Sequence, residues 1–403
     1  MSTPSEAGVM LSSRIATINT TLADAASNPA VSAVGGDTAG SFTMSRPGYC
    51  LRATGSAAGF DTIADGREAL RSGAHEYIVG ALPFDLRSPA ALTAPAFVDH
   101  SAGPFDAGEP AAPPRVSEVR AEPEPETHLA RLDRALGELR SPETALEKVV
   151  IARTLRVDFD ESLDPDVLLS RLVAADHAGN GFRVDLSPAG ADHAGCTLVG
   201  SSPEVLVARK GTVVTCHPLA GSAPRYTDPD ADRASADALA ASAKDRREHA
   251  LVIDSLRSAL APLCSSVDAP ATPTLTHTPA LWHLGTPIRA TLRDKDTTAL
   301  DLAAALHPTP AVCGTPTDSA RELITGLEGD RGFYAGTVGW CDSAGDGEWL
   351  VTIRCAELSA DGRSARAYAG GGIVAESDPA AELAETSTKF RTVLRALGVA
   401  EGE

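Results

Sequence analysis

The sequence lacks the features that mark three common kinds of protein. No apolar run approaches the roughly 18–20 residues of a membrane span, and the polar start MSTPSEAG has neither the basic nor the apolar region of a secretory signal. The seven cysteines are odd in number, widely spaced and without a CxxC pair. This spacing argues against a disulfide framework and against a zinc ribbon. We therefore expect a soluble, reduced, cytoplasmic protein.

Basic residues are also scarce relative to acidic ones. The chain has 403 residues, of which 54 are acidic and 35 are basic, and its net charge is −19. Such a field repels polyphosphates and anionic membrane surfaces, so neither nucleic acid nor a membrane is an expected partner. A small anionic substrate would have to be held by local cations or by a metal ion. Apolar residues make up 43% of the chain, which is enough for a sizeable core.

The order of the expected elements favours an antiparallel or mixed sheet. Residues 1–126 show only short strand-like runs, at 76–79 and 81–84, and end in a Pro-rich stretch that is typical of a surface connection. Strands and helices come in groups, rather than in the alternation of a Rossmann-like fold. Beyond residue 126 the pattern predicts a helix that closes at 141–142, a strand at 147–157, a hairpin at 204–218, a helix over about 232–261 and a strand at 349–358. A last helix is expected to open at Asp378-Pro379. Its apolar stripe consists of Leu383, Phe390, Leu394 and Leu397.

Three glutamates occupy positions that need an explanation. Glu248 has Val252 and Leu256 at i+4 and i+8, which places its carboxylate on the helix stripe that should face the core. Glu382 and Glu385 are three apart and share a face of the last helix. Glu248 could be half of an ion pair, and the other two could form a solvated helix start that the helix dipole favours. Together the three also resemble an oxygen-rich site for a hard divalent ion such as Mg²⁺.

Four further side chains have both an ordinary and a functional interpretation. Lys148 opens an apolar strand, so its amine either emerges at the strand end or is buried, loses its proton and acts as a general base. Glu204 follows a Gly-Ser-Ser-Pro turn and could point into a cleft. Arg354, within the expected strand 349–358, faces solvent or a cleft in which it would suit a carboxylate. Tyr334 is either core filler or a ligand contact.

Two glycine-containing segments could bring backbone N–H groups close to an anion. These are LAGSAPR at 219–225 and AGGGIV at 369–374. A bulge or tight turn is the commoner use of such segments.

Eight segments, in this order, resemble the chorismate-utilising enzymes, and within that family the isochorismate synthases of the siderophore-pathway type. They cover nearly all of residues 147–390, whereas the N-terminal third matches chiefly through GALPFD at 80–85. The segments are EKVVIARTL (147–155), GSSPEVLV (200–207), HPLAGSAPR (217–225), SAKDRREHALV (242–252), LWHLGTPI (281–288), HPTPAVCGTP (307–316), FYAGTVGWCDSAGDGEWLVTIRCAEL (333–358) and AGGGIVAESDPAAELAETSTK (369–389).

The resemblance implies an anthranilate synthase component I-like α/β (α+β) fold. In this fold two facing, largely antiparallel β-sheet layers are flanked by helices, and the active site lies in the central cleft. We expect one integrated domain with a variable N-terminal part, 1–126, and a chorismate-binding catalytic region, 127–398.

The resemblance also implies a role for each candidate residue. Lys148 matches the general base that activates water, and Glu204 matches the general acid that protonates the departing C4 hydroxyl of chorismate. Glu248 and Glu385 match Mg²⁺ ligands, with Glu382 nearby. The implied substrate-binding residues are Gly221, Ser222, His307, Ala311, Tyr334, Arg354, Gly370, Gly371, Gly372 and Lys389.

The implied activity is that of an isochorismate synthase, a Mg²⁺-dependent isomerase. It adds water at C2 of chorismate while the C4 hydroxyl is lost. Lys148 favours water over ammonia as the nucleophile. Ala220 stands where certain aminodeoxychorismate-forming relatives carry a lysine, which argues against that branch. We expect no glutaminase subunit, and a monomer.

Three alternatives remain open. A salicylate synthase would also eliminate pyruvate, but Ala311 stands where such lyases tend to carry a bulkier polar residue. The menaquinone branch is a second alternative, although VGWCDS and GEW look more like the siderophore branch. The third is an inactive chorismate-binding scaffold, against which the joint presence of the base, the acid and the metal ligands argues. One departure from the family is AGGG at 369–372, where many relatives read AGAG.

Overall fold

The strands of the chain form one long antiparallel path. The computed structural model describes residues 40–106 and 108–400, and in this part of the chain a seventeen-stranded sheet accompanies a three-stranded one. Every strand pair in them is antiparallel. In order of hydrogen-bonded neighbours the large sheet runs β5 (Val116–Glu122), β6 (Lys148–Phe159), β20 (Ser364–Ile373), β19 (Cys355–Leu358), β8 (Thr197–Gly200), β7 (Gly181–Asp185), β1 (Phe42–Arg46), β2 (Tyr49–Phe60), β4 (Ala91–Ala102), β3 (Tyr77–Leu82), β17 (Thr337–Asp342), β18 (Gly347–Val351), β9 (Val205–Lys210), β10 (Val213–His217), β15 (Ile288–Leu292) and β12 (Cys264–Asp268), with β16 (Gly314–Thr315) paired to the start of β6.

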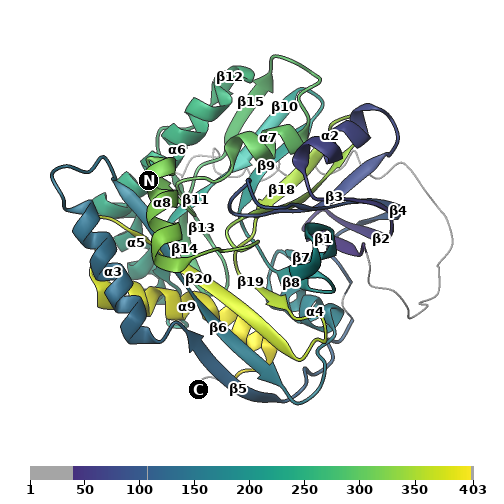
Figure 1. Cartoon of the computed structure of the whole chain (residues 1–403). Coiled ribbons are helices and arrows are strands. Elements are labelled where there is room, and N and C mark those ends of the chain that lie inside the picture. The colour runs from purple at the N-terminus through teal and green to yellow at the C-terminus, as the bar shows by residue number, and fades with distance from the viewer. Residues whose placement is uncertain (1–39, 107, 401–403) are drawn as a thin grey trace, which may run out of the picture.

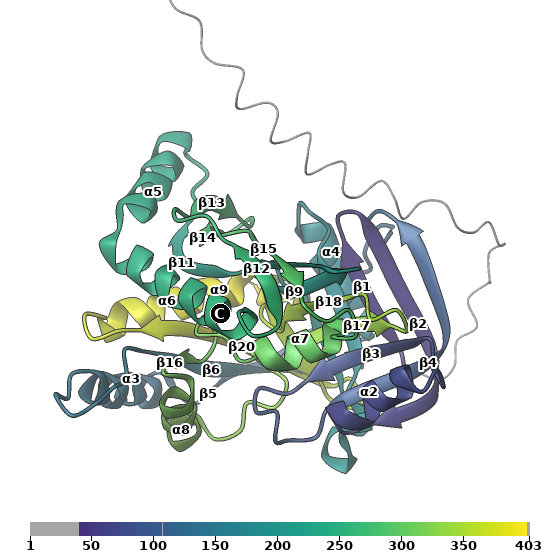
Figure 2. The ribbon, with the colours of Figure 1, turned by 90° about the horizontal axis from the view of Figure 1, so that it is seen from above.

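The row of strands curls back on itself, so that its two ends face each other as two layers. We call these two ends of the sheet its arms. Figure 1 shows β5, β6 and β20 at the bottom and β9, β10 and β15 at the top. The second sheet lies to one side of the arms, next to α5 and α6 (Figure 2). Its strands are β11 (Leu219–Pro224), β14 (Leu281–Gly285) and β13 (Thr274–His277). This arrangement confirms the expected fold.

The helices cover the outer faces of the sheet. α3 and α9 pack on β6 and β20, and α4 packs on α9 and β7. One cluster of buried apolar side chains fills the large core, and a smaller one lies beneath α4 and α9. The helices are α2 (Ile63–Arg71), α3 (Pro125–Leu139), α4 (Pro165–Ala175), α5 (Pro229–Ala241), α6 (Ala243–Leu260), α7 (Ala299–Leu306), α8 (Thr317–Glu328) and α9 (Pro379–Leu397). Within the described residues, none of them is both long and apolar enough to cross a membrane.

The N-terminal part is more regular than the sequence pattern indicated. The two predicted runs merge into β3, and β1, β2, β4 and α2 surround it. The Pro-rich stretch is not wholly a connection, because β5 forms within it and pairs with β6. Strands of this part also pair with β7 and β17, so the sheet continues across the expected boundary at 126. The polar start falls outside the described residues.

Two long elements expected from the sequence are each divided. The helix expected at 232–261 is two helices, because Ser242 ends α5 and its side chain then caps α6 by accepting a hydrogen bond from the Asp245 N–H. The strand expected at 349–358 is interrupted at 352–354, between β18 and β19. The helix before 141, the hairpin β9–β10 and the Asp378 cap of α9 are confirmed.

The buried stripe of α9 differs from the predicted one. Phe390 and Leu397 are buried as expected, whereas Leu383 and Leu394 are only half-buried. Further buried positions on α9 are Glu382, Thr386, Val393 and Ala396. A carboxylate therefore lies among the core-facing positions of this helix, next to Gly371 of β20.

Candidate active site

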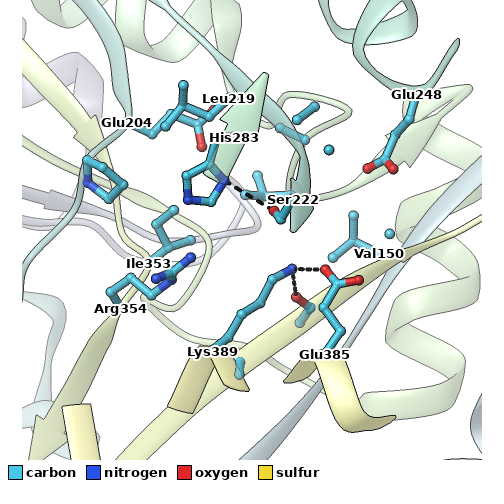
Figure 3. A pocket seen from close by; sticks show the side chains of 18 of the residues that line it. Val150, Glu204, Leu219, Ser222, Glu248, His283, Ile353, Arg354, Glu385 and Lys389 are labelled. Carbon is cyan, nitrogen blue, oxygen red and sulfur yellow. Dashed lines mark hydrogen bonds and ion pairs between the residues drawn. The ribbon is translucent and has the colours of Figure 1, made fainter. Parts of the chain in front are cut away.

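A cavity between the two arms gathers most of the predicted site residues. It is lined from β6, β20, β11, β14, α6 and α9, and by the turns before β9 and β19. Figure 3 shows Glu204 and Arg354 on one side, Glu248 on the other, and Glu385 with Lys389 below them. The predicted residues that line the cavity are Glu204, Gly221, Ser222, Glu248, Ala311, Tyr334, Arg354, Gly370, Gly372, Glu385 and Lys389.

Lys148 is buried at the end of the cavity where Glu248 lies. Its side chain is 0% exposed, and its Nζ lies 2.8 Å from Glu248 Oε1. The two groups form an ion pair without hydrogen-bond alignment, since Nζ has no hydrogen-bond partner among the described residues. A Cβ on Gly372 would lie 2.6 Å from that glutamate oxygen and 3.0 Å from Lys148 Cε. Glycine at 372 therefore leaves the room that this ion pair occupies.

Glu204 is a buried carboxyl group at the other end of the cavity. It directly precedes β9 and is 3% exposed. Burial raises its pKa to about 7, although the backbone N–H of Leu219, Lys148 and Arg354 all favour the charged form. A substantial fraction of this side chain therefore carries a proton at neutral pH. Glu204 and Glu248 lie at opposite ends of the cavity (Figure 3). Because Lys148 pairs with Glu248, the Glu204 carboxyl group and the Lys148 amine are also separated.

Arg354 reaches the cavity from a strained backbone position. It lies in the interruption between β18 and β19 and has φ 53°, a left-handed conformation that is unusual for a residue with a side chain. Ala335, next to Tyr334, has φ 57°, and its N–H donates to Thr352 O at 2.9 Å. The strand expected at 349–358 therefore does not continue through Arg354. The irregular turn is what directs the guanidinium into the cavity, and burial lowers its pKa.

The sequence reasoning did not single out His283, which also lines the cavity. Its Nδ1 lies 3.1 Å from Ser222 Oγ, and its Nε2 is buried without a partner in the described part of the chain. Burial, with a smaller contribution from Arg354 and Lys389, holds its pKa well below the usual range. The imidazole is therefore neutral. The sequence did contain a signal for this residue, because a histidine between two apolar residues of a strand, in LWHLGTPI, is unusual enough to suggest a functional position.

Each of the three candidate metal-binding glutamates has a lysine partner. Glu248 pairs with Lys148, as described above. Glu385 Oε1 lies 2.7 Å from Lys389 Nζ, which also donates to Gly370 O at 2.8 Å. Glu382 Oε1 lies 3.2 Å from Lys244 Nζ. The negative charge at this end of the cavity is thus balanced by ammonium groups.

Glu382 and Glu385 differ in environment. Glu382 is 3% exposed; it accepts a hydrogen bond from Ser377 Oγ at 2.8 Å, and its Oε2 is buried without a described partner. Burial and the charge of Glu385 raise the pKa of Glu382. For Glu385, burial alone would raise the pKa, but Lys389, Lys244 and Arg354 lower it below its ordinary value. Glu385 is therefore the more readily ionised of the two.

The donor set fits a magnesium site built on two carboxylates. Among the described residues, no three His, Cys, Asp or Glu side chains are close enough together to hold a metal ion. Glu248 and Glu385 nevertheless face the same cavity. Mg²⁺ in proteins commonly takes one or two carboxylates, with water and substrate oxygens completing its shell. Glu382 Oε2, which has no partner among the described residues, lies next to Gly371 of β20.

Four predicted residues do not line the cavity. Lys148 and Glu382 lie directly behind its wall. Gly371 faces away from it, since a Cβ there would lie 3.1 Å from Glu382 Oε2. His307 is buried elsewhere, with Nε2 3.1 Å from Phe84 O. The cavity instead includes residues that the sequence reasoning did not select, namely Val150, Lys244, Asp245, His283, Ile353 and Tyr368.

The glycine-containing segments at 219–225 and 369–374 are strands rather than loops. Gly221 in β11 has φ 82°, which only glycine adopts easily. Gly370 and Gly372 point to the same side of β20, as alternate residues of a strand do. There, Cβ atoms would approach Tyr334 Oη and Glu248 respectively. The absence of side chains keeps this floor of the cavity open.

Comparison with known proteins defines the class to which this site belongs. The family described as "Chorismate binding enzyme" matches residues 102–398, about three quarters of the chain. The chain belongs to this family.

Individual relatives extend the match. MenF of Mycobacterium tuberculosis H37Rv is 53% identical over 365 residues, with 89% of this chain and 96% of that protein covered. Isochorismate synthase DhbC of Bacillus subtilis is 48% identical over 343 residues, covering 83% and 84%. The crystal structure of DhbC from Bacillus anthracis superposes with a TM-score of 0.82 at 38% identity, covering 90% and 98%. These findings confirm the family that the sequence motifs indicated.

Proposed function

We propose that this chain is an isochorismate synthase that converts chorismate to isochorismate. One observation carries the proposal. A buried carboxyl group with a pKa of about 7, Glu204, lies at one end of a cavity, and a buried amine, Lys148, lies behind the wall at the other end, beside Glu248. The reaction needs a proton donor for the leaving C4 hydroxyl and a proton acceptor for the water that attacks C2. The relatives named isochorismate synthase agree with this activity.

The two groups must act in complementary protonation states. Glu204, kept partly protonated by burial, gives its proton to the hydroxyl at C4 as the C–O bond breaks and the ring double bonds shift. Lys148 takes a proton from the water that bonds to C2. In the structure the Lys148 amine lies 2.8 Å from Glu248 Oε1, so base action requires that Glu248 turn away from it.

The other cavity residues hold a dianion in place. Arg354 presents a guanidinium that suits the enolpyruvyl carboxylate. Tyr334 and the Ser222–His283 pair supply further polar contacts. The neutral imidazole of His283 offers Nε2 without adding charge. Fixing both ends of the substrate converts the addition of water into a reaction between oriented partners.

Glu248 and Glu385 would hold Mg²⁺, with Glu382 behind them. The ion would supply positive charge to the ring carboxylate of chorismate in a molecule whose net charge is −19. The lysine partners of these carboxylates would then be free to turn towards the substrate.

We further assign the chain to siderophore rather than menaquinone biosynthesis. The VGWCDS and GEW segments and the likeness to DhbC proteins support this assignment. In the source organism, deletion of the gene should impair growth under iron limitation, with rescue by dihydroxybenzoate or salicylate. Rescue by menaquinone alone would contradict the assignment.

Product analysis tests the proposed reaction. Purified protein with chorismate and Mg²⁺ should give isochorismate as the main product on chromatography. Salicylate and pyruvate as main products would establish the lyase alternative. Recovery of unchanged chorismate from folded, Mg²⁺-supplied protein would favour an inactive scaffold.

A further inference from the structure

Two tyrosines form the wall between the substrate cavity and a second cavity. Tyr334 and Tyr368 stack with ring centroids 4.9 Å apart and an angle of 7° between their planes. Both rings line the candidate active site, and both also line a separate cavity of about 530 Å³ beneath the α8–β17 connection. They are the only residues common to the linings of these two cavities.

The two rings come from different kinds of backbone. Tyr334 belongs to the connection between α8 and β17, next to the strained Ala335. Tyr368 is in the middle of β20, where it pairs with Thr154 of β6. Its hydroxyl group interacts with the side chain of Arg366. Tyr368 is therefore fixed by the sheet, whereas Tyr334 depends on its neighbours for its orientation.

The neighbours of Tyr334 define the plane of its ring. The Arg331 guanidinium lies 6.0 Å from the ring centroid, in addition to the stacked Tyr368. Arg331 is itself fixed by Glu328, at 2.6 Å, and by the carbonyls of Val150 and Val312. Held in this way, the Tyr334 hydroxyl lies over Gly370, where a Cβ would approach it to 3.0 Å.

We propose that Tyr368 is a positioning residue for substrate binding, and that it acts through Tyr334. The stacked ring keeps the Tyr334 hydroxyl at the cavity floor and closes the wall to the second cavity. Without the ring, Tyr334 can tilt into the space that Tyr368 leaves, and water from the second cavity reaches the substrate. This inference rests on the proposed function, because the effect is read from the KM for chorismate.

A double-mutant cycle of Tyr334→Ala and Tyr368→Ala tests the proposal, with KM and kcat measured for isochorismate formation. Stacked aromatic pairs stabilise by an amount that corresponds to about a three- to tenfold change in an equilibrium constant. Tyr368→Ala should therefore raise KM about three- to tenfold and lower kcat less, whereas Tyr368→Phe, which keeps the stack, should restore KM. In the Tyr334→Ala background, Tyr368→Ala should leave KM unchanged.

Other results overturn the proposal. An unchanged KM in a folded Tyr368→Ala protein, or effects on KM that simply add in the double variant, would show that Tyr368 is only structural. Tyr77→Ala is the matched control, since it removes a half-buried ring of β3 that lines neither cavity, and it should not alter KM. If Tyr368→Ala does not fold, Tyr368→Leu replaces it.

Failure of the proposed function is distinguishable from failure of this inference. A wild-type protein without turnover would refute the proposed function. The wild-type protein and the three variants of the cycle would then be compared by their unfolding midpoints in urea and by chorismate binding in calorimetry. Additive effects on both quantities would overturn the role of Tyr368, and coupling in both would support it.

Discussion

At the scale of single residues, the protonation of Glu204 follows from its burial. Its pKa of about 7 lies above the ordinary value near 4.5, so the folded protein retains a proton that the unfolded chain releases between these two pH values. Stability therefore falls as pH rises through this interval, because the folded state binds more protons there than the unfolded state. Above about pH 7 the accumulated cost is roughly 3 kcal/mol.

Glu204→Gln should remove this pH dependence and most of the activity. The amide keeps the size of the side chain but does not titrate, so the loss of stability between about pH 5 and pH 7 should become smaller. Because the amide cannot act as a general acid, kcat should fall about 10²- to 10⁴-fold. Urea unfolding at several pH values and steady-state kinetics measure the two effects. A wild-type kcat in the variant would remove Glu204 from the proposed mechanism.

Lys148→Met tests the other half of the proton transfer. Methionine keeps the apolar stem of the side chain and removes the amine, so kcat should fall about 10²- to 10⁴-fold while the far-ultraviolet circular dichroism spectrum is preserved. Lys210→Met, at the exposed end of β9, is the control and should keep full activity. Activity of Lys148→Met within a few fold of wild type would mean that another group accepts the proton.

At the scale of elements, the glycine face of β20 makes room for the site. A Cβ at Gly372 would approach Glu248 Oε1 to 2.6 Å, closer than atoms of that kind pack, and the strand backbone is paired there with Val150 of β6. The clash must therefore be relieved by moving Glu248, which weakens its ion pair with Lys148. This face of the strand serves the cavity, and Gly371 on the opposite face serves the packing of α9.

Gly372→Ala should lower kcat/KM at least tenfold with little change in the unfolding midpoint. Gly137→Ala is the matched control, because nothing lies within 4 Å of a Cβ added there, in the last turn of α3. That variant should be fully active and slightly more stable, since alanine favours helix over glycine. Steady-state kinetics and thermal unfolding of both proteins measure the difference. Full activity of Gly372→Ala would show that Glu248 has more freedom than its contacts indicate.

The periodicity of apolar residues predicted those helices and strands that have one apolar face, and it failed to predict those that do not. Leu132, Leu136 and Leu139 make one buried stripe, so α3 was evident. β2 and β4 extend beyond the core and expose residues on both faces, so their sequences carry no alternation. The interruption at Arg354 was hidden because apolar residues continue through it in WLVTIRCAEL, although its backbone leaves the strand conformation.

The site could be predicted in part for similar reasons. Glu248 stood out because a carboxylate on an apolar stripe is costly without a partner. The partner, Lys148, comes from a strand one hundred residues earlier, and only the tertiary fold brings the two together. His283 and Lys244 were missed because a lone histidine on a strand and a lysine in a charged run have ordinary uses. The resemblance to a known family, rather than spacing, supplied the roles.

At the scale of the whole molecule, we expect the fold to form without a metal ion. The antiparallel path and its two apolar clusters hold the arms together, and each candidate metal-binding carboxylate already has a lysine partner. Removing divalent cations with EDTA should therefore abolish turnover and leave the thermal midpoint within a few degrees of its value. Re-addition of Mg²⁺ should restore activity. A large drop in the midpoint on chelation would reveal a structural metal site.

The central claim is that Lys148 activates a water molecule for attack at C2 while Glu204 helps the C4 hydroxyl to leave. The origin of the new hydroxyl oxygen tests this claim most directly. The reaction would be run in water enriched in oxygen-18 and stopped at low conversion, and the isochorismate would be analysed by mass spectrometry. Our account predicts one heavy oxygen in each new product molecule, located at C2. Product that retains only the original oxygens would contradict it, because the hydroxyl would then have migrated within the substrate.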